Sequence, residues 1–589
     1  MAFSSTALSH WMIGAAGAML LVGALPAAAQ TREEILREAD RPLSQAPTTT
    51  IETEDGIERA PCPLANPEFA GVSLTLQAVD FANLGPIDPA LLDEAWRGRV
   101  GSEIRVADIC DIRDRAATIL RNEGYLAAVR VPVQTIENGR VRLDILAARL
   151  VGIQVRGDAG ANEAQLARYL SKLEGQPLFN AYDAERYLLL AGSIPGMAAR
   201  LTLRPGGAPG EVVGEVTVER TPAYFDTNIQ NYGGNSVGRW GGIARVRFNG
   251  LTGMGDETTL GFYATPDFDE QKVVQGSHEF RIGGEGLTVG TSATYAWTEP
   301  TLPGNPDIQS ETLVVSGYAR YPLVLRQARS LWAGGGFDFI DQDIDIGGVA
   351  LNRDRLRIGF ARIDANWIDP DAFAGGGEYS PGEPRWSAGL ALEVRQGIAG
   401  LGASPQCSSN PPACFGPGRT PTSRAEGDPA ATVVRATAEL VWRPVPAFTI
   451  AVMPRGQYSP DALLAYEEFS AGNFTIGRGY DPGTVSGDSG VGTAVELRLG
   501  SLVPANNKDI AIQPFVFFDA GWLWNEDSAF AGLGAEEVYS VGGGARIALG
   551  DKFRLDLTAA QPLRRTTFET DRQDLRFLIS LTAQFGLGR

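Results

Sequence analysis

The spacing of hydrophobic and polar residues changes along this chain near residue 221. Before that point, segments with apolar residues three and four positions apart mix with short segments in which every second residue is apolar, as expected for helices and strands. After it the helical spacing disappears, and alternating segments of about 10–13 residues follow one another between clusters of Gly, Pro, Asn and Asp. The pattern predicts α/β domains followed by a long all-strand region.

The first 29 residues have the pattern of a secretory signal peptide. An apolar run from Trp11 to Leu25 is followed by small residues that suit cleavage before Gln30. No Lys or Arg precedes the run, which leaves an N-terminal membrane anchor as the alternative. After residue 29 there is no run of about 18 apolar residues, so the sequence predicts no transmembrane helix.

Residues 30–68 predict a short helix and a linker. The charged segment Thr31–Arg41 begins with a capping residue, Thr31, and has Glu34 three positions later, which is the pattern of a capping box. Pro42 ends the helix, because proline cannot continue one. A segment rich in Pro, Thr and Glu follows to about residue 68.

Two consecutive segments, 69–149 and 150–220, repeat one order of elements: strand, helix, helix, strand, strand. The first has a strand around Val72–Leu76, helices at Asp88–Trp96 and Val106–Asn122, and strands at Leu126–Gln134 and Arg140–Leu146. The second has Leu150–Arg156, Asn162–Leu173, Tyr182–Ala191, Met197–Leu203 and Val212–Glu219 in the same roles. This is an internal repeat of fold order, which predicts two copies of one small α/β domain.

From residue 221 to residue 589 the strands have one apolar and one polar face. One such strand places Trp386, Ala388, Leu390, Leu392 and Val394 on one face and Ser387, Gly389, Ala391, Glu393 and Arg395 on the other. A soluble sandwich would bury the apolar face, whereas a membrane barrel turns it toward lipid and lines its lumen with the charged face. Alternation alone is compatible with both folds.

Three further features favour a membrane barrel. The strands are long enough to cross a bilayer when tilted, about 16 can be counted, and an even number is usual for single-chain bacterial barrels. Short connections such as Gly283–Gly286 alternate with long ones such as Ser459–Asp488, although Asp369–Pro384 is longer than its place predicts. The last strand alternates from Phe577 to Phe585, with Gly586–Arg589 beyond it.

Composition narrows the functional classes. The chain has 589 residues, a formal net charge of −19 and only two histidines, His10 and His278. An acidic chain repels nucleic acid, so neither DNA nor RNA is expected as a partner. His278 alternates with apolar residues, and no Gly-Lys pair is present for a phosphate-binding loop. We therefore expect no enzyme activity, no cofactor, no metal site and no small-molecule substrate.

Four cysteines suit an oxidising compartment. Cys407 and Cys414 lie in a loop-like segment where a local disulfide would fit, which leaves Cys62 and Cys110 as the second pair. Four cysteines allow three connectivities, so this pairing is a preference and not a deduction.

Several motifs give the chain a resemblance to a known family. The first α/β repeat ends in Gly124–Ile145, in which Gly124, Tyr125, Pro132, Gln134 and Gly139 carry the motif. The segment Ser459–Asp488, the sixth far-side loop by strand count, contains Gly477-Arg478-Gly479-Tyr480. The thirteenth strand contains Phe517-Phe518-Asp519-Ala520-Gly521, which places Phe517, Asp519 and Gly521 on one face.

With these motifs the chain resembles the two-partner secretion transporters, the haemolysin secretion/activation proteins, within the superfamily of POTRA-plus-barrel proteins. The resemblance implies an outer-membrane barrel of about 16 antiparallel strands behind two periplasmic POTRA domains, with the helix Thr31–Arg41 as a plug. It also implies that the sixth loop folds into the lumen, where Arg478 pairs with Asp519. Gly477 stands where the family usually has an apolar residue.

The resemblance implies the export of a partner exoprotein, unfolded in the periplasm, through a barrel surrounded by outer-membrane lipid. A barrel-assembly or insertion factor of the same superfamily is the alternative, but such proteins more often have three or five POTRA domains and no plug helix. A passive diffusion porin is a third possibility. It would not need the long segment that precedes the barrel in this chain.

Overall fold

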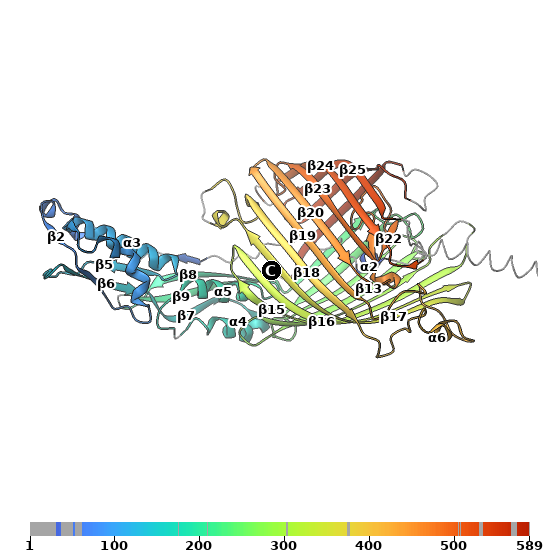
Figure 1. The fold of residues 1–589 in the computed structure, drawn as a ribbon, viewed down its shortest axis with the longest axis horizontal. Coiled ribbons are helices and arrows are strands. Elements are labelled where there is room, and N and C mark those ends of the chain that lie inside the picture. The colour runs from blue at the N-terminus through green and yellow to red at the C-terminus, as the bar shows by residue number, and fades with distance from the viewer. Residues whose placement is uncertain are drawn as a thin grey trace, which may run out of the picture.

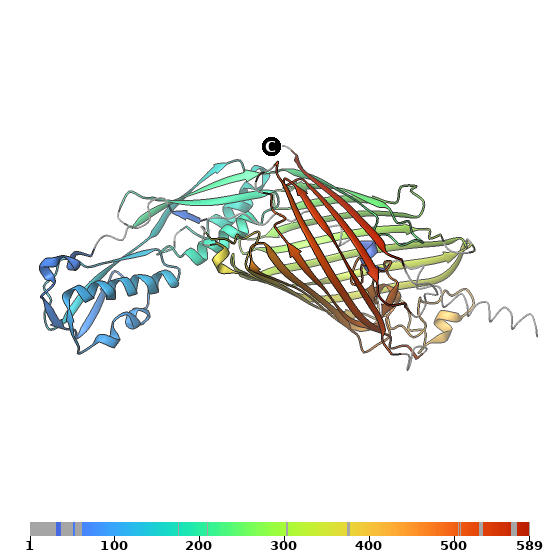
Figure 2. The same ribbon diagram turned by 90° about the horizontal axis from the view of Figure 1, so that it is seen from above.

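The fold consists of two α/β domains joined end to end and followed by one large barrel (Figures 1 and 2). The computed structural model describes residues 31–36, 51–53, 62–174, 176–208, 210–301, 304, 306–373, 377–504, 506, 508–528, 534–566 and 574–587. The predicted signal peptide and most of the predicted linker lie outside these residues. No helix within them is both long enough and apolar enough to cross a membrane.

The first α/β domain packs one long helix against a small sheet. Its main elements are β2 (Ser73–Thr75), β3 (Ala78–Ala82), β4 (Glu103–Arg105), α3 (Ile109–Asn122), β5 (Ala127–Arg130) and β6 (Arg140–Ala147). The sheet order is β3-β6-β5, and α3 buries Ile109, Ile112 and Leu120 against it.

Several elements of this domain differ from the sequence prediction. The predicted first strand, Val72–Leu76, is β2, which pairs with β4 outside the main sheet, and β3 and β4 were not predicted. The predicted helix at residues 88–96 is a 3-10 helix, Pro89–Ala95, in which the Asp88 side chain accepts a hydrogen bond from the Ala90 N–H. The predicted strand Leu126–Gln134 is only β5, because Pro132 has no N–H to donate to a strand ladder.

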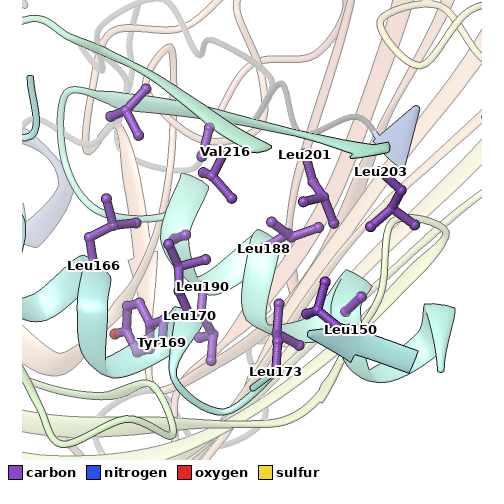
Figure 3. Close-up of a cluster of buried hydrophobic side chains, with 14 of the residues drawn as sticks. Leu150, Leu166, Tyr169, Leu170, Leu173, Leu188, Leu190, Leu201, Leu203 and Val216 are labelled. Carbon is purple, nitrogen blue, oxygen red and sulfur yellow. The ribbon is translucent and has the colours of Figure 1, made fainter. Parts of the chain in front are cut away.

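The second α/β domain repeats this arrangement with a larger sheet. Its elements are β7 (Arg149–Gly157), α4 (Glu163–Leu170), α5 (Ala181–Gly192), β8 (Met197–Pro205) and β9 (Glu211–Arg220). Leucines from both helices and from β7 and β8 fill one core around Leu188 and Leu201 (Figure 3). A strand that the sequence pattern did not predict, β1 (Ile51–Thr53), extends the sheet to the order β1-β8-β9-β7.

The second α/β domain lies against one end of the barrel (Figure 1), and polar side chains join the two. Lys172 forms an ion pair with Glu285 at 2.7 Å, and Gln165 donates to the Gly283 carbonyl at 2.8 Å. Arg186 donates to the Pro322 carbonyl at 3.1 Å. These contacts hold α4, the residues after it and α5 against the turn between β13 and β14 and against the last residues of β15.

The barrel is a closed antiparallel sheet of sixteen strands within the described residues, which confirms the predicted number. The strands are β10 (Ala223–Gln230), β11 (Gly241–Asn249), β12 (Glu257–Ala264), β13 (Gln271–Ile282), β14 (Leu287–Thr298), β15 (Ile308–Leu325), β16 (Arg329–Ile346), β17 (Val349–Ile368), β18 (Trp386–Gly397), β19 (Thr432–Val445), β20 (Phe448–Tyr458), β23 (Ser489–Leu499), β24 (Ile510–Trp524), β25 (Glu536–Leu549), β26 (Phe553–Pro562) and β27 (Arg576–Leu587). The antiparallel pairing of β10 with β27 closes the cylinder.

The two faces of the barrel strands settle the choice that alternation left open. On β18, Leu390 and Val394 are 45% and 44% exposed, whereas Arg395 is 2% exposed. The apolar side chains therefore point outward and the charged ones inward, which is the arrangement of a membrane barrel and not of a soluble sandwich. His278 lies on the same outward face as Val274 and Ile282, as its alternation predicted.

The connections follow the predicted lengths at most positions. The connection at residues 369–385, which is longer than its place predicted, joins β17 to β18 at the end that carries the α/β domains, so the strand count holds there. At the opposite end β16 and β17 meet in a two-residue turn, Gly347-Gly348, both with positive φ, as this kind of hairpin turn requires.

Candidate functional site

The connection between β20 and β23, residues 459–488, folds into the barrel lumen and forms the centre of the candidate site. It contains two short strands, β21 (Phe469–Ala471) and β22 (Val485–Gly487), which pair with each other. Ile476 and Tyr480 near its tip are 2% and 0% exposed. We refer to residues 459–488 as the lumen loop.

The lumen loop brings Arg478 onto Asp519 of β24, the residue with which the family resemblance pairs it. Arg478 Nε and Nη2 donate to the two Asp519 carboxylate oxygens at 3.1 and 2.7 Å, and the Arg478 backbone N–H donates to the same carboxylate at 2.9 Å. Ser540 adds a hydroxyl donor at 3.0 Å. A forked guanidinium suits this two-point contact, and the buried carboxylate gains four donors.

A second carboxylate beside this pair was not singled out by sequence reasoning. Glu496 of β23, 2% exposed, accepts from Arg478 Nη1 at 2.5 Å. It also accepts from both terminal nitrogens of Arg546 at 2.9 Å and from Arg498 Nε at 2.7 Å. The only sequence signal was the alternation that turns Glu496 inward, and many lumen charges share that signal.

Aromatic rings and close backbone contacts surround the tip of the lumen loop at Arg478. The Arg478 guanidinium carbon lies 3.6 Å from the centre of the Phe517 ring, within cation–π distance. The Tyr480 hydroxyl, which has one hydrogen to donate, lies within hydrogen-bond distance of the carbonyls of Tyr539 and Arg564, at 3.0 and 2.8 Å. A Cβ on Gly479 would lie 2.6 Å from the Pro562 nitrogen, so only glycine fits there.

Ile476, the residue before Gly477, provides apolar packing at the tip of the lumen loop. Its side chain enters a space left by two glycines: a Cβ on Gly492 would lie 2.5 Å from Ile476 Cδ1, and one on Gly521 would lie 3.5 Å from Ile476 Cγ2. Gly477 itself has φ +99°, a conformation that L side chains rarely adopt.

The described part of the predicted plug helix also lies inside the barrel (Figures 1 and 2). This helix, α2 (Arg32–Leu36), begins with a capping box in which the Thr31 N–H donates to Glu34 at 3.0 Å and the Glu34 N–H donates to Thr31 at 3.3 Å. Ile35 is fully buried among lumen side chains, and Gln275 of β13 donates to the Leu36 carbonyl at 3.2 Å. Residues 37–41 of the predicted helix lie outside the described part.

The motif of the first α/β domain shapes that domain and its junction with the second. A Cβ on Gly124 would lie 2.6 Å from Asn180 Oδ1 of the second domain, and one on Gly139 would lie 2.0 Å from the Thr75 carbonyl. Tyr125 bridges to Asn180 as an isolated β-pair.

Pro132 and Gln134 act together where β5 ends. Beyond the proline, the Gln134 amide exchanges two hydrogen bonds of 2.8 Å with the Arg142 backbone, so it substitutes for the ladder that Pro132 interrupts. In this structure the motif residues hold the shape of the domain.

Cysteine pairing in the structure follows the preferred connectivity. Cys62 is joined to Cys110, with 6.0 Å between their Cα atoms, and ties the start of the first domain to α3. Cys407 is joined to Cys414 in the connection between β18 and β19. In the described part of the chain, no group of three or more His, Cys, Asp or Glu side chains is placed to hold a metal ion.

These features define a class of protein before any comparison is made. A closed barrel with an apolar outer face, two α/β domains at one end, and a loop and a helix inside the lumen define a membrane β-barrel that carries soluble domains.

Comparison with known families then shows which group within that class the chain is similar to. Residues 382–547 match the family described as haemolysin secretion/activation protein ShlB/FhaC/HecB, and residues 74–147 match the POTRA domain of ShlB type. These matches confirm the resemblance to two-partner secretion transporters. They also place the barrel in the outer membrane, with the matched POTRA domain in the periplasm. The lumen loop begins at the opposite end of the barrel, which is then the extracellular end.

Individual relatives are similar in part of the sequence or in the fold. The heme/hemopexin transporter protein HuxB of Haemophilus influenzae is 26% identical over 164 residues, which are 27% of this chain and 29% of that relative. The structure of CdiB from Escherichia coli has a TM-score of 0.72 at 16% identity, covering 94% of this chain and 96% of that one. CdiB from Acinetobacter baumannii has a TM-score of 0.63 at 14% identity, covering 99% and 100%. At these identities the structural likeness concerns the fold.

Proposed function

We propose that this chain recognises an unfolded partner exoprotein through its periplasmic POTRA domains and exports it through the barrel. The observation that carries the proposal is the occupied lumen: α2 and the lumen loop both lie inside the barrel, and each is held there by side-chain contacts. Glu33 of α2 pairs with Arg455 of the wall at 3.5 Å and accepts from Ser470 of the loop at 3.0 Å. Such contacts can open without unfolding the barrel.

Docking of the partner would use the edge of a POTRA sheet. In support, the edge strand β8 already pairs with an added strand, since β1 lies parallel to it with Ile51, Glu52 and Thr53 opposite Leu201, Thr202 and Leu203. An extended segment of a partner can add to such an edge through main-chain hydrogen bonds, without requiring a particular sequence. The resemblance to two-partner secretion transporters implies that folding of the partner outside the cell drives export, and we include this step in the proposal.

The alternative is a barrel-assembly or insertion factor of the same superfamily. Two POTRA-type domains and a helix inside the lumen favour export over assembly. A porin is disfavoured because α2 and the lumen loop both occupy its path.

The test is co-expression of the chain with the secreted, repeat-rich protein that we expect an adjacent open reading frame to encode. The partner should appear in the culture medium only when the chain is present. Partner release without the chain would refute the proposal. Loss of unrelated outer-membrane barrels on deletion of the chain would instead support the assembly factor.

A further inference from the structure

The extracellular mouth of the barrel is crossed by one segment of the connection between β18 and β19. We call residues 421–428 the strap. Its first residue is Pro421, whose carbonyl accepts a hydrogen bond from the Arg353 N–H at 2.8 Å. Ser423 donates to the Asp354 carboxylate from its N–H at 2.8 Å and from its hydroxyl at 2.6 Å. The strap is therefore anchored to β17 on one side of the mouth.

From β17 the strap continues to the base of the lumen loop. The Ser423 hydroxyl accepts the Ala465 N–H at 3.1 Å, and the Asp428 N–H donates to the Ala462 carbonyl at 2.8 Å. A Cβ on Gly427 would lie 2.7 Å from Leu464 Cδ2, so the two segments approach as closely as glycine allows. The strap and the loop base thus form one packed layer.

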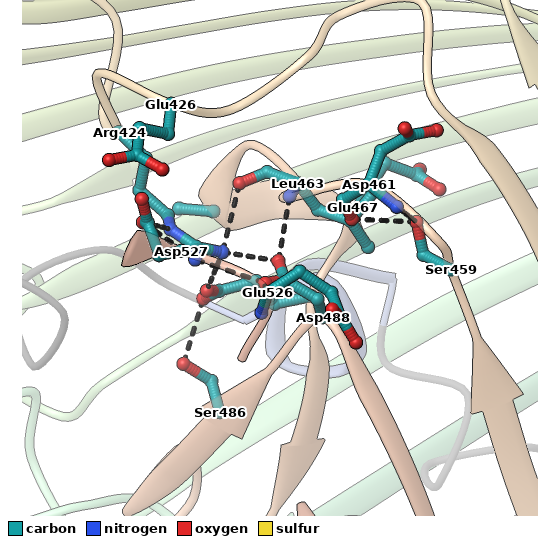
Figure 4. Close-up of polar contacts among 12 residues, drawn as sticks. Arg424, Glu426, Ser459, Asp461, Leu463, Glu467, Ser486, Asp488, Glu526 and Asp527 are labelled. Carbon is teal, nitrogen blue, oxygen red and sulfur yellow. Dashed lines mark hydrogen bonds and ion pairs between the residues drawn. The ribbon is translucent and has the colours of Figure 1, made fainter. Parts of the chain in front are cut away.

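Arg424 is the centre of this layer (Figure 4). Its guanidinium contacts three carboxylates: two of the lumen loop, Glu468 at 2.7 Å and Asp488 at the loop's last residue, and Asp527 of the connection after β24 at 2.8 Å. It also donates to the Leu463 carbonyl at 3.0 Å. The Arg424 side chain is only 13% exposed.

One cation, Arg424, faces three carboxylates, so the contact between the strap and the lumen loop depends on this one residue. Asp488 is fully buried and accepts the backbone N–H groups of Leu463 and Glu526 at 2.6 and 2.7 Å. Without Arg424, three carboxylates would face one another in a poorly solvated place, where like charges repel strongly. Removal of Arg424 would therefore push the lumen loop and the connection after β24 apart.

We propose that Arg424 is a positioning residue that holds the lumen loop closed at the extracellular mouth, and that this contact must open before a partner can leave. It anchors the base of the loop, whereas Arg478 anchors its tip. The need for opening before a partner leaves rests on the proposed export function. The closure by Arg424 concerns the pore alone and does not need a partner.

The test measures single-channel currents of the purified full-length chain in planar bilayers. Arg424→Ala should raise the mean open conductance or the open time several-fold over the wild type. The matched control is Arg419→Ala, an exposed arginine of the same connection, which should leave both unchanged. Currents of Arg424→Ala that equal those of the wild type would overturn the proposal.

A second variant tests the charge argument and guards against a misfolded single variant. Arg424→Ala combined with Asp527→Asn removes one of the repelling carboxylates, so its currents should fall back toward the wild type. A double variant as open as the single one would refute the electrostatic cause. Export is scored separately. A chain that exports nothing but opens on Arg424→Ala refutes the proposed function and not the closure by Arg424.

Discussion

At the residue scale, the contact of Arg478 with Asp519 depends on a cation held between two buried carboxylates. Asp519 and Glu496 are 1% and 2% exposed, and both accept from the same guanidinium. Breaking a buried pair by removing one partner costs about 3–5 kcal/mol, because the remaining charge is left uncompensated. The tip of the lumen loop should therefore lose its position without Arg478, while the sixteen-stranded wall keeps its own hydrogen bonds.

We expect Arg478→Ala to reduce secretion of the partner strongly while the barrel still folds. Arg478→Lys should give an intermediate result, since an ammonium keeps the charge and loses the fork. Secretion is measured as partner in the medium, and folding as the mobility shift between unheated and heated samples on a gel. Arg419→Ala is the control. Secretion by Arg478→Ala at the wild-type level would exclude Arg478 from the export mechanism.

The close approach of the backbone to Gly479 allows a prediction that depends on steric exclusion and not on charge. An added methyl group would lie 2.6 Å from the Pro562 nitrogen, and backbone atoms cannot move aside as a flexible side chain can. Gly479→Ala should displace the loop tip and make the bond after Arg478 accessible to trypsin added to intact cells. Gly317→Ala, where a Cβ would meet nothing within 4 Å, should stay protected. Equal protection of both variants would contradict this account.

Sequence reasoning reached part of this site and stopped for a physical reason. Arg478 and Asp519 were recognisable because each lies in a motif. Glu496 and Arg546 were not, because alternation turns every charged residue of a strand inward and cannot say which of them meet. Arg424 lies in a segment rich in Gly and Pro without periodicity, so its contacts depend on how three connections fold together.

At the element scale, periodic segments were predictable and short, locally irregular ones were not. The strands β8 and β9 lie within a residue or two of their expected ranges. Helix α3 ends where expected, and its first three expected residues form a 3-10 turn. Strand β1 has three residues and no pattern of its own, because the free edge of β8 supplies its hydrogen-bonding partner. Its existence is a property of the neighbouring sheet and not of the linker sequence.

The pairing of β1 with β8 leads to a prediction about the linker. If partner segments dock on this edge, β1 occupies their place, so fixing it there should block export. Glu52 and Thr202 are opposite each other in the parallel register and can be replaced by cysteines. The double variant should lose partner secretion when treated with a short bismaleimide cross-linker and retain it when untreated. Each single-cysteine variant is a control, and undiminished secretion after complete cross-linking would exclude β8 as a docking edge.

At the scale of the whole molecule, the outward apolar face explains why the alternating strands form a cylinder in lipid. Leu390, Val516 and Phe577 are 45%, 55% and 66% exposed, and lipid is the environment in which such exposure carries no penalty. Closure through β10 and β27 leaves no free edge within the described barrel. The lumen is then a polar space, and passage through it depends on α2 and the lumen loop, which occupy it.

The filling of that space can be tested by exchanging the charges of one contact. Glu33 of α2 meets Arg455 of β20, so Glu33→Arg would place two cations together and should expel the helix. We expect higher single-channel conductance in planar bilayers for this variant, as for deletion of residues 31–41. Adding Arg455→Glu restores an attractive pair with reversed signs and should lower the conductance again.

This exchange shows whether α2 closes the pore or only lies in it. The two substitutions change the attraction between positions 33 and 455 without shortening the chain. If the helix blocks the pore, conductance follows the sign of the interaction between positions 33 and 455 and rises most in the deletion. If all three variants conduct like the wild type, α2 lies in the lumen without limiting it, and the lumen loop alone closes the barrel. The helix would then have no gating role in export.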